Sequence, residues 1–142
     1  MKKTFNFLGF DFGASSGRAM LGAFDGERVE IRELHRFLNE PVDLVGRFSW
    51  DVPRLFFEMK QALNKAAKEG LRIDAIGIDT WGVDFGLIDK NGYLLGNPVH
   101  YRDARTDGVM EEAFAVMPQE EIFRHTGLAF MQFNTLYQPY AM

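Results

Sequence analysis

Apolar and polar residues alternate along the first forty positions in a way that predicts three strands. Phe5–Phe12 is mostly aromatic and aliphatic, which is typical of a buried strand. Arg18–Phe24 and Val29–Phe37 have similar character and are separated by Asp25-Gly26, a dipeptide that favours a tight turn. With the small residues 13–17 turning the chain between the first two strands, the pattern predicts an antiparallel meander.

The apolar spacing changes after residue 50. Asp51 is a good N-cap, Pro53 fits a first helical turn, and Gly70 is a stop signal, so the sequence predicts a helix over 53–69. Ile73–Thr80 then reads as another buried strand. The apolar residues of the predicted helix recur three or four positions apart: Leu55, Met59, Ala62, Leu63 and Ala66.

The second half of the chain has a less regular pattern. Val83–Ile88 and Tyr93–Leu95 flank Asp89-Lys90-Asn91-Gly92, whose Asn-Gly pair predicts a β-hairpin. Val109–Met117 has helical spacing and must end at Pro118, and Gln119–His125 predicts a short helix stopped by Gly127. Asn134 is a candidate N-cap for a last helix, in which Pro139 would fall past the first turn and break it.

The predicted order is strand, strand, strand, helix, strand, then a hairpin and further helices. This order indicates an α/β fold in which a mixed sheet is covered by helices. Leu8-Gly9-Phe10-Asp11 and Ile76-Gly77-Ile78-Asp79 repeat the same apolar-Gly-apolar-Asp pattern. If these two strands are neighbours, Asp11 and Asp79 lie at one carboxyl-end edge, where open α/β sheets bind ligands. The alternative interpretation is that each aspartate only caps a turn.

The segment Asp11–Arg18 carries the most chemistry. Gly13 and Gly17 permit close backbone approach and positive φ, and successive amides of such a turn can form an anion-binding nest. Ser15 and Ser16 add hydroxyl groups and Arg18 adds a forked cation, both suited to phosphate oxygens. Asp11 is a candidate Mg²⁺ ligand. The alternative is a plain hairpin turn beside an exposed arginine.

Composition and charge bound the class of protein. The 142 residues allow one domain with a sizeable core, and the absence of cysteine excludes disulfides, thiolate metal sites and a cysteine nucleophile. Sixteen basic against twenty acidic residues give a net charge of −4, which argues against nucleic acid as a general partner. No apolar run approaches the roughly 20 residues of a membrane span, and the start lacks the apolar region of a signal peptide, so we expect a cytoplasmic location and no membrane partner.

Asp-x-Gly-x-Ser-Ser-x-Arg between two strands resembles the first phosphate motif of the actin, Hsp70 and sugar-kinase superfamily. More narrowly, the chain resembles the N-terminal part of the FGGY carbohydrate kinases over nearly its whole length, and most closely the branch that acts on L-rhamnulose. The run Asp79-Thr80-Trp81-Gly82-Val83-Asp84-Phe85 is the most specific match. Further matching stretches are His35-Arg36-Phe37, Pro98-Val99-His100-Tyr101-Arg102-Asp103-Ala104-Arg105-Thr106 and Asn134-Thr135-Leu136-Tyr137-Gln138.

The resemblance implies a fold, a reaction and site residues. The fold would be ribonuclease-H-like, with a sheet of the five-stranded type, and residues 1–142 would be an incomplete N-terminal kinase domain whose partner is a C-terminal domain. The reaction would be ATP- and Mg²⁺-dependent transfer of the γ-phosphate to a ketose hydroxyl, giving L-rhamnulose 1-phosphate. ATP would bind at Gly13, Ala14, Ser15, Ser16, Gly17 and Arg18, with Asp11 at the metal. The sugar would contact Gly82, Trp81, Asp84, Tyr101, Arg102 and Asp103.

Other interpretations remain open from the sequence. The alternative place for Trp81 is the core, and we assign no role to His100. The family's general base, an aspartate, falls outside the matched segments, so no catalytic residue is predicted in this chain and the chain alone is expected to be inactive. A ribonuclease-H-like nuclease would place two metals at Asp11 and Asp79. A non-catalytic, nucleotide-binding fragment is the third possibility. We also expect exposed apolar surface, since an incomplete domain leaves faces uncovered.

Overall fold

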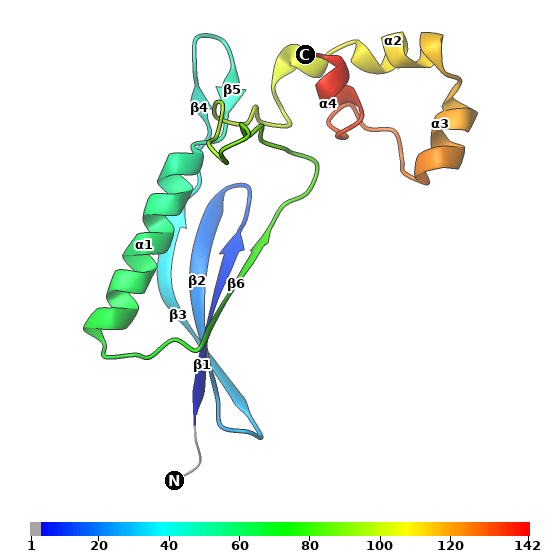
Figure 1. Ribbon diagram of the computed structural model, residues 1–142. Helices are drawn as coiled ribbons and strands as arrows, with labels where there is room; N and C mark the ends of the chain where they lie inside the picture. Colours follow the sequence, from blue (N-terminus) through cyan, green and yellow to red (C-terminus); the bar gives the residue numbers. More distant parts are fainter. Residues whose placement is uncertain (1–3) are drawn as a thin grey trace. The chain divides into compact units, whose positions relative to one another are not determined.

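The computed structural model describes residues 4–142, which form two compact units (Figure 1). Unit 1 contains the described residues up to Pro41 together with Asp51–Gly82. Unit 2 contains Val42–Trp50 and Val83–Met142. Each unit is therefore assembled from two separate stretches of chain.

Unit 1 is built on a four-stranded mixed sheet in the order β3-β2-β1-β6. Strands β1 (Phe5–Phe12), β2 (Ser16–Phe24) and β3 (Val29–Leu38) form the predicted antiparallel meander. Strand β6 (Ala75–Thr80) pairs with β1 in parallel, and the register aligns Asp11 with Asp79. The predicted α/β class, the strand order and the neighbouring aspartates are confirmed, although the sheet of residues 4–142 has four strands rather than the five of the expected type.

A β-bulge in β3 decides which of its side chains reach the core. Ala19 pairs with His35 and Met20 with Glu33, so Leu34 is an extra residue on β3. After the bulge, His35 and Phe37 share a face with the core residue Ala19; before it, the odd-numbered positions point the other way. The bulge therefore explains why Ile31 is exposed while Leu34 and Phe37 are both buried.

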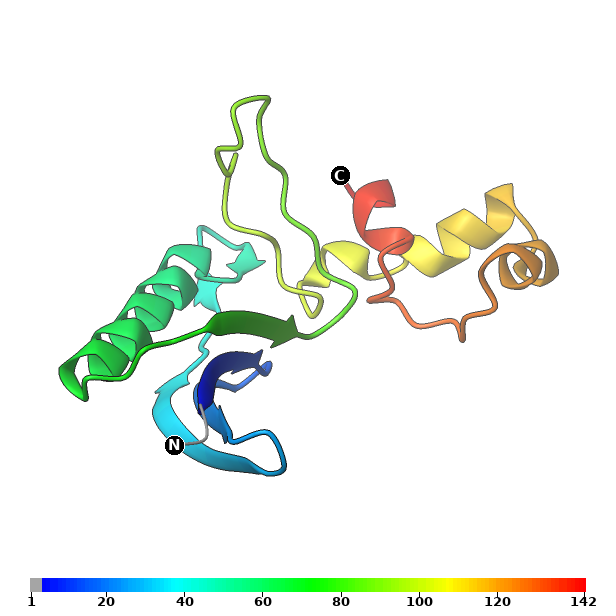
Figure 2. The ribbon, with the colours of Figure 1, turned by 60° about the horizontal axis from the view of Figure 1, so that its bottom comes forward.

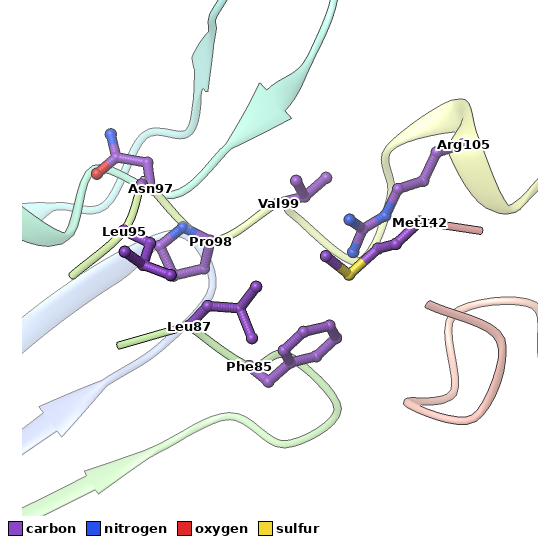
Figure 3. Close-up of a pocket in the computed structure, with 9 residues that line it drawn as sticks. Phe85, Leu87, Leu95, Asn97, Pro98, Val99, Arg105 and Met142 are labelled. Carbon is purple, nitrogen blue, oxygen red and sulfur yellow. The ribbon is translucent and has the colours of Figure 1, made fainter. Parts of the chain in front are cut away.

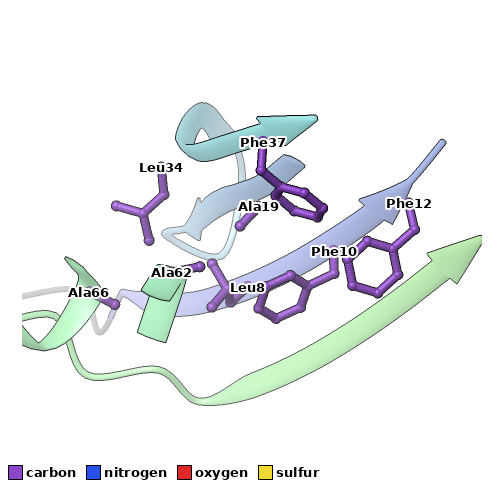
Figure 4. Packing of buried hydrophobic residues seen from close by; sticks show 8 residues of the cluster. All are labelled: Leu8, Phe10, Phe12, Ala19, Leu34, Phe37, Ala62 and Ala66. Atoms are coloured by element: carbon purple, nitrogen blue, oxygen red, sulfur yellow. The ribbon is translucent and has the colours of Figure 1, made fainter. Parts of the chain in front are cut away.

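Helix α1 (Val52–Lys68) covers one face of this sheet (Figures 1 and 2). Asp51 is its N-cap and accepts a hydrogen bond from the Arg54 amide, as predicted, and Gly70 follows with a φ of +69°. Figure 4 shows Ala62 and Ala66 of α1 opposite the apolar side chains of the strands. The core they form consists of Leu8, Phe10, Phe12, Ala19, Leu34, Phe37, Ala62 and Ala66.

Strand β6 continues the apolar face of β1 but is not covered to the same extent. Ile76 pairs with Leu8 and Ile78 with Phe10, so both lie on the face that α1 covers elsewhere. Yet Ile76 is 50% and Ile78 59% exposed, whereas Leu8 and Phe10 are buried. The expectation of exposed apolar surface is confirmed at this strand.

Unit 2 contains a two-stranded sheet and short helices joined by long loops. Strands β4 (Val42–Asp43) and β5 (Phe48–Ser49) form a small hairpin that the sequence pattern did not predict. The 3-10 helix η1 (Ala104–Thr106) precedes α2 (Val109–Val116) and α3 (Gln119–Thr126), and α4 (Tyr137–Tyr140) comes last. The predictions for α2 and α3 are confirmed, including the C-terminal stop at Gly127, whose φ is +65°.

Two predictions for unit 2 need correction. Segment 83–95 doubles back at Asp89, whose side chain accepts hydrogen bonds from the Asn91 and Tyr93 amides (Figure 2). Its arms are joined by backbone hydrogen bonds from Asp89 to Tyr93 and from Leu95 to Leu87, and by a bridge between Ile88 and Leu94. The predicted turn and the pairing across it are therefore present, but neither arm is a regular strand. Asn134 does not cap α4, because its side chain donates to the Ala129 carbonyl. Helix α4 begins after Leu136, so Pro139 falls in its first turn, where proline is tolerated.

Candidate functional site

Four charged residues form a row across the sheet of unit 1, on the face opposite α1. The strand registers align Asp79 with Asp11, Asp11 with Arg18 and Arg18 with Arg36. Paired residues of neighbouring strands point to the same face, so the row runs from two carboxylates to two guanidinium groups. Asp11 Oδ2 lies 3.2 Å from Arg18 Nε, and both side chains are about half exposed. The row places opposite charges beside the turn at residues 13–15.

That turn is short, and hydrogen bonds from Asn39 hold it in place. The Gly13 amide donates to the Ser16 carbonyl at 2.9 Å, which closes the turn. Asn39, only 4% exposed, donates its side-chain Nδ2 to the Gly13 carbonyl at 2.8 Å and its backbone amide to the Ser15 carbonyl at 3.1 Å. The amides of Ala14 and Ser15, both in exposed residues, make no hydrogen bond within residues 4–142. They are therefore available to an anion.

Gly13 and Gly17 are each required to be glycine, but for different structural reasons. A Cβ on Gly13 would lie 2.9 Å from the Ser16 carbonyl oxygen, so only glycine fits the closed turn. A Cβ on Gly17 would lie 2.1 Å from the Phe37 ring, so Gly17 makes room for a core side chain. Neither glycine has a positive φ, in contrast to the conformational role that the sequence suggested.

Asp11 and Asp79 are the oxygen donors beside the turn that would suit a metal ion. Among residues 4–142, no group of three or more histidine, cysteine or acidic side chains is arranged to hold a metal. Mg²⁺ in nucleotide sites typically takes one or two carboxylates and fills its remaining positions with phosphate oxygens and water. The donor set therefore fits an ion that arrives with phosphates rather than a resident metal centre.

The segment Trp81–Asp84 passes from unit 1 to unit 2. Trp81 is half-buried and packs against the core of unit 1, and Gly82 is exposed with open space where a Cβ would lie. Val83 has a φ of +69°, a left-handed conformation that is strongly disfavoured for a β-branched residue. Such backbone strain persists only where surrounding contacts hold it, and it concentrates at functional sites.

Those contacts come from residues 135–138. Thr135 Oγ1 donates to the Val83 carbonyl at 2.6 Å, and Gln138 Nε2 donates to the same carbonyl at 3.0 Å. Gln138 Nε2 also lies 3.2 Å from Asp84 Oδ1, while Trp50 Nε1 donates to Asp84 Oδ2 at 2.6 Å. Both oxygens of Asp84 therefore already have partners inside unit 2.

Gln138 is a buried hub, only 1% exposed. Besides its contacts with Val83 and Asp84, its Nε2 donates to the Phe133 carbonyl, and its Oε1 accepts from Arg105 Nη2 at 2.8 Å. A buried carboxamide with partners on both ends fixes the segments it joins, since any unpaired end would cost free energy.

Tyr101 and Arg102 lie beside a stack of aromatic rings. His100 lies between Trp50 and Tyr101, with ring centroids 4.1 and 4.5 Å apart and both interplanar angles at 28°. Burial lowers the pKa of His100, and its Nδ1 accepts from the Arg102 amide at 2.9 Å, so it is a neutral packing residue. The Arg102 guanidinium lies 5.4 Å from the centre of the Tyr101 ring and is exposed.

Asp103 is buried and carries structural contacts. It is 5% exposed and accepts from the Phe48 amide at 2.7 Å, the Arg105 amide at 3.0 Å and the Arg47 side chain at 3.3 Å. Burial on its own raises the pKa of this carboxyl, but the hydrogen bonds from Phe48 and Arg105 outweigh burial and hold the pKa below its ordinary value. Its oxygens thus have less freedom to read a sugar hydroxyl than the sequence suggested.

Unit 2 also contains an apolar pocket of about 190 Å³ that the sequence did not indicate. Figure 3 shows Phe85 and Leu87 facing Pro98 and Val99, with the Arg105 guanidinium at one end. Tyr101, Arg102 and Asp103 do not line it. A second pocket of about 220 Å³ lies among residues of α3, α4 and the loop before α4.

Sequence comparison decides the family. The profile described as "FGGY family of carbohydrate kinases, N-terminal domain" matches residues 6–138. The chain belongs to the FGGY family of carbohydrate kinases. It is 48% identical over 130 residues to a rhamnulokinase of Enterobacter sp. (strain 638), covering 90% of this chain and 27% of that protein. It is 45% identical over 135 residues to a rhamnulokinase of Halalkalibacterium halodurans, covering 95% of this chain and 29% of that protein.

Solved structures show the same fold. A gluconate kinase from Lactobacillus acidophilus superposes with a TM-score of 0.78 at 17% identity, covering 98% of this chain and 28% of that one. A Plasmodium falciparum glycerol kinase solved with ADP superposes at 0.74 and 20% identity, covering 94% and 27%. The FGGY chain described here thus spans less than a third of each relative and structure compared.

Sequence reasoning found the turn and its flanking charges but missed the residues that hold them. Asn39 and Gln138 make their contacts with residues 26 and about 55 positions away. Trp50, which bonds Asp84, was not singled out either. One signal was present for Gln138, because it ends the last stretch that resembles the FGGY kinases.

Among residues 4–142, no helix is long and apolar enough to cross a membrane. The location of the protein stays a prediction.

Proposed function

We propose that residues 1–142 are the N-terminal domain of an ATP-dependent kinase that phosphorylates L-rhamnulose to L-rhamnulose 1-phosphate. The observation that carries the proposal is the level of identity, 45–48%, to two rhamnulokinases over at least 90% of this chain. The turn at residues 13–15, with its available amides and the neighbouring Arg18, supports an anion site in the same domain.

In this proposal the phosphates of ATP meet the amides of Ala14 and Ser15, the hydroxyls of Ser15 and Ser16, and Arg18. A bound Mg²⁺ beside Asp11 supplies charge neutralisation for the phosphate oxygens. The hydroxyl oxygen of the ketose forms a bond to the γ-phosphorus, the bond from that phosphorus to the bridging oxygen breaks, and ADP leaves. The hydroxyl proton passes to a base that we place in a second domain, outside this chain.

The sugar in this proposal meets Trp81, Gly82, Asp84, Tyr101, Arg102 and Asp103. The described contacts divide this set into two groups. Gly82 and Arg102 are exposed and accessible to a ligand, whereas the carboxylates of Asp84 and Asp103 already accept hydrogen bonds from other groups of unit 2. We therefore assign direct sugar contact first to Gly82, Tyr101 and Arg102, and a supporting role to the two aspartates.

The test is a coupled assay of ADP release by the longer protein that carries this chain, with Mg²⁺, ATP and L-rhamnulose, and with D-xylulose, gluconate and glycerol as competitors. We expect the highest kcat/KM for L-rhamnulose and no turnover by residues 1–142 alone. Arg18→Ala is expected to raise the KM for ATP.

Two outcomes would contradict the proposal. Absence of ATP-dependent product from every sugar would reject the kinase. Mg²⁺-dependent cleavage of an RNA–DNA hybrid that is lost in both Asp11→Asn and Asp79→Asn would favour a nuclease instead, since those carboxylates share one register position.

A further inference from the structure

Thr135 and Gln138 hold the left-handed backbone at Val83 in place, and this clamp takes no direct part in the proposed phosphate transfer. A β-branched residue in this conformation is strained, so the fold must supply contacts that outweigh the strain. Two donors on one carbonyl, from residues more than 50 positions later in the chain, supply them.

The clamp also reaches the side chain of the next residue. Gln138 Nε2 lies 3.2 Å from Asp84 Oδ1, and Arg105 Nη2 donates to the other end of the same amide. Because Gln138 is 1% exposed, its amide cannot turn to water when one partner is lost. The orientation of Val83 and Asp84 is therefore coupled to the position of residues 135–138.

We propose that Thr135 and Gln138 are positioning residues for the sugar, acting through Val83 and Asp84. The inference rests on the proposed function, because it takes the segment Gly82–Asp84 as part of the sugar site. Neither side chain touches the substrate: they hold the Val83 backbone, which follows the sugar-contact residue Gly82, and the supporting carboxylate of Asp84. Their loss then weakens sugar binding and leaves ATP binding unchanged.

Thr135 permits a clean pair of variants. Thr135→Val removes the hydroxyl that donates to Val83 and keeps the shape, while Thr135→Ser keeps the hydroxyl. The matched control is Thr126→Val, because Thr126 Oγ1 makes the same type of bond, to the Ile122 carbonyl at 3.0 Å in α3. A change of fold stability alone would affect Thr135→Val and Thr126→Val alike.

The experiment measures the KM for L-rhamnulose and for ATP, together with the melting temperature, in the longer protein. We expect Thr135→Val to raise the KM for the sugar about threefold to tenfold, the equivalent of one net hydrogen bond, with the KM for ATP unchanged. Thr135→Ser is expected to restore the sugar KM, and Thr126→Val to leave it at the wild-type value. Gln138→Met is expected to give the largest rise.

The outcomes separate the two proposals. If the wild-type protein phosphorylates no sugar, the proposed function fails. If the wild type is active but Thr135→Val and Gln138→Met change the KM for ATP as much as that for sugar, or match Thr126→Val, the positioning role is wrong. Where Gln138→Met does not fold, the Thr135 pair alone decides between these results.

Discussion

In each unit a buried side-chain carboxamide holds a segment that we assign to ligand binding. The surroundings of the two carboxamides differ. In unit 1, Asn39 donates hydrogen bonds to the Gly13 and Ser15 carbonyl oxygens. The amides of this turn stay exposed, and the half-exposed charges of Asp11 and Arg18 lie beside them. Gln138 holds Val83 and Asp84 within a network in which the aspartate oxygens already have partners. Unit 1 thus leaves polar groups exposed beside its turn, whereas the polar groups of unit 2 are hydrogen-bonded within its own structure.

The difference follows from what each unit has for a core. Unit 1 buries a continuous apolar cluster between a sheet and α1, so its polar groups at the strand ends need not support the fold. Unit 2 has short helices and a two-stranded sheet, and its buried residues include His100, Asp103 and Gln138. A carboxylate in such a place is a poor indicator of ligand contact, even within a motif that matches a family of enzymes.

The largest expected effect is on stability, and it comes from substituting Asp103 in unit 2. Asp103→Ala leaves the Phe48 and Arg105 amides and the Arg47 side chain without their acceptor, so we expect a loss of about 3 kcal/mol in the free energy of unfolding. Urea unfolding measures it. The control is Asp107→Ala, because the Asp107 side chain accepts a hydrogen bond only from Gln132 among residues 4–142. A stable variant whose only defect is a raised KM for sugar would make Asp103 a ligand residue instead.

Gly13 tests unit 1 at the turn itself. A Cβ there meets the Ser16 carbonyl oxygen at 2.9 Å, so Gly13→Ala must open the turn and displace its amides. We expect kcat/KM for ATP to fall on the order of 10²-fold, with the KM for sugar nearly unchanged. The control is Gly9→Ala in the preceding strand β1, where the nearest atom to a new Cβ, the Met20 carbonyl oxygen, is 3.9 Å away. Equal effects of the two variants would reject the assignment of the turn to phosphate.

A smaller effect is expected from the hydrogen bond between Asn39 and the turn of unit 1. Asn39→Ala removes one hydrogen bond to the Gly13 carbonyl, and we expect the KM for ATP to rise about threefold to tenfold. Asn6 provides a matched control, because its Nδ2 donates to the Arg72 carbonyl at 2.9 Å in the same unit. Asn6→Ala should lower stability to a similar extent without changing the KM for ATP. A rise in that KM for both variants would mean that Asn39 acts only through stability.

The smallest expected effect concerns acid stability of unit 1. Burial on its own raises the pKa of Glu58, but hydrogen bonds from His35 at 2.6 Å and Arg54 outweigh burial and hold the pKa below its ordinary 4.5. A depressed carboxyl pKa contributes stability above pH 4.5 and loses it as pH falls through the folded-state pKa. Glu58→Gln should therefore flatten the fall in melting temperature below about pH 4.5. The exposed Glu112→Gln should leave that fall unchanged, and a Glu58→Gln profile identical to wild type would disprove the linkage.

The sequence predicted unit 1 far better than unit 2, and the reason is physical. Strands and helices that bury one apolar face leave a period in the sequence, and the repeated apolar-Gly-apolar-Asp pattern was enough to align Asp11 with Asp79. The bulge at Leu34 breaks the period by one residue and passed unnoticed. In unit 2 the contacts join single polar side chains to distant carbonyls, and such contacts leave no period at all. Gln138 could therefore not be found from spacing, and the same is true of Asn39 in unit 1, whose contacts are also single hydrogen bonds to distant carbonyls.

The division of ligands between the two regions is tested most directly by backbone amide NMR of the protein, titrated separately with a non-hydrolysable Mg²⁺–ATP analogue and with L-rhamnulose. The nucleotide is expected to shift the amide signals of Ala14, Ser15 and Ser16, and the sugar those of Gly82, Val83 and Asp84. Nucleotide titration that leaves residues 13–18 unchanged, or sugar titration that shifts them instead, would contradict the account.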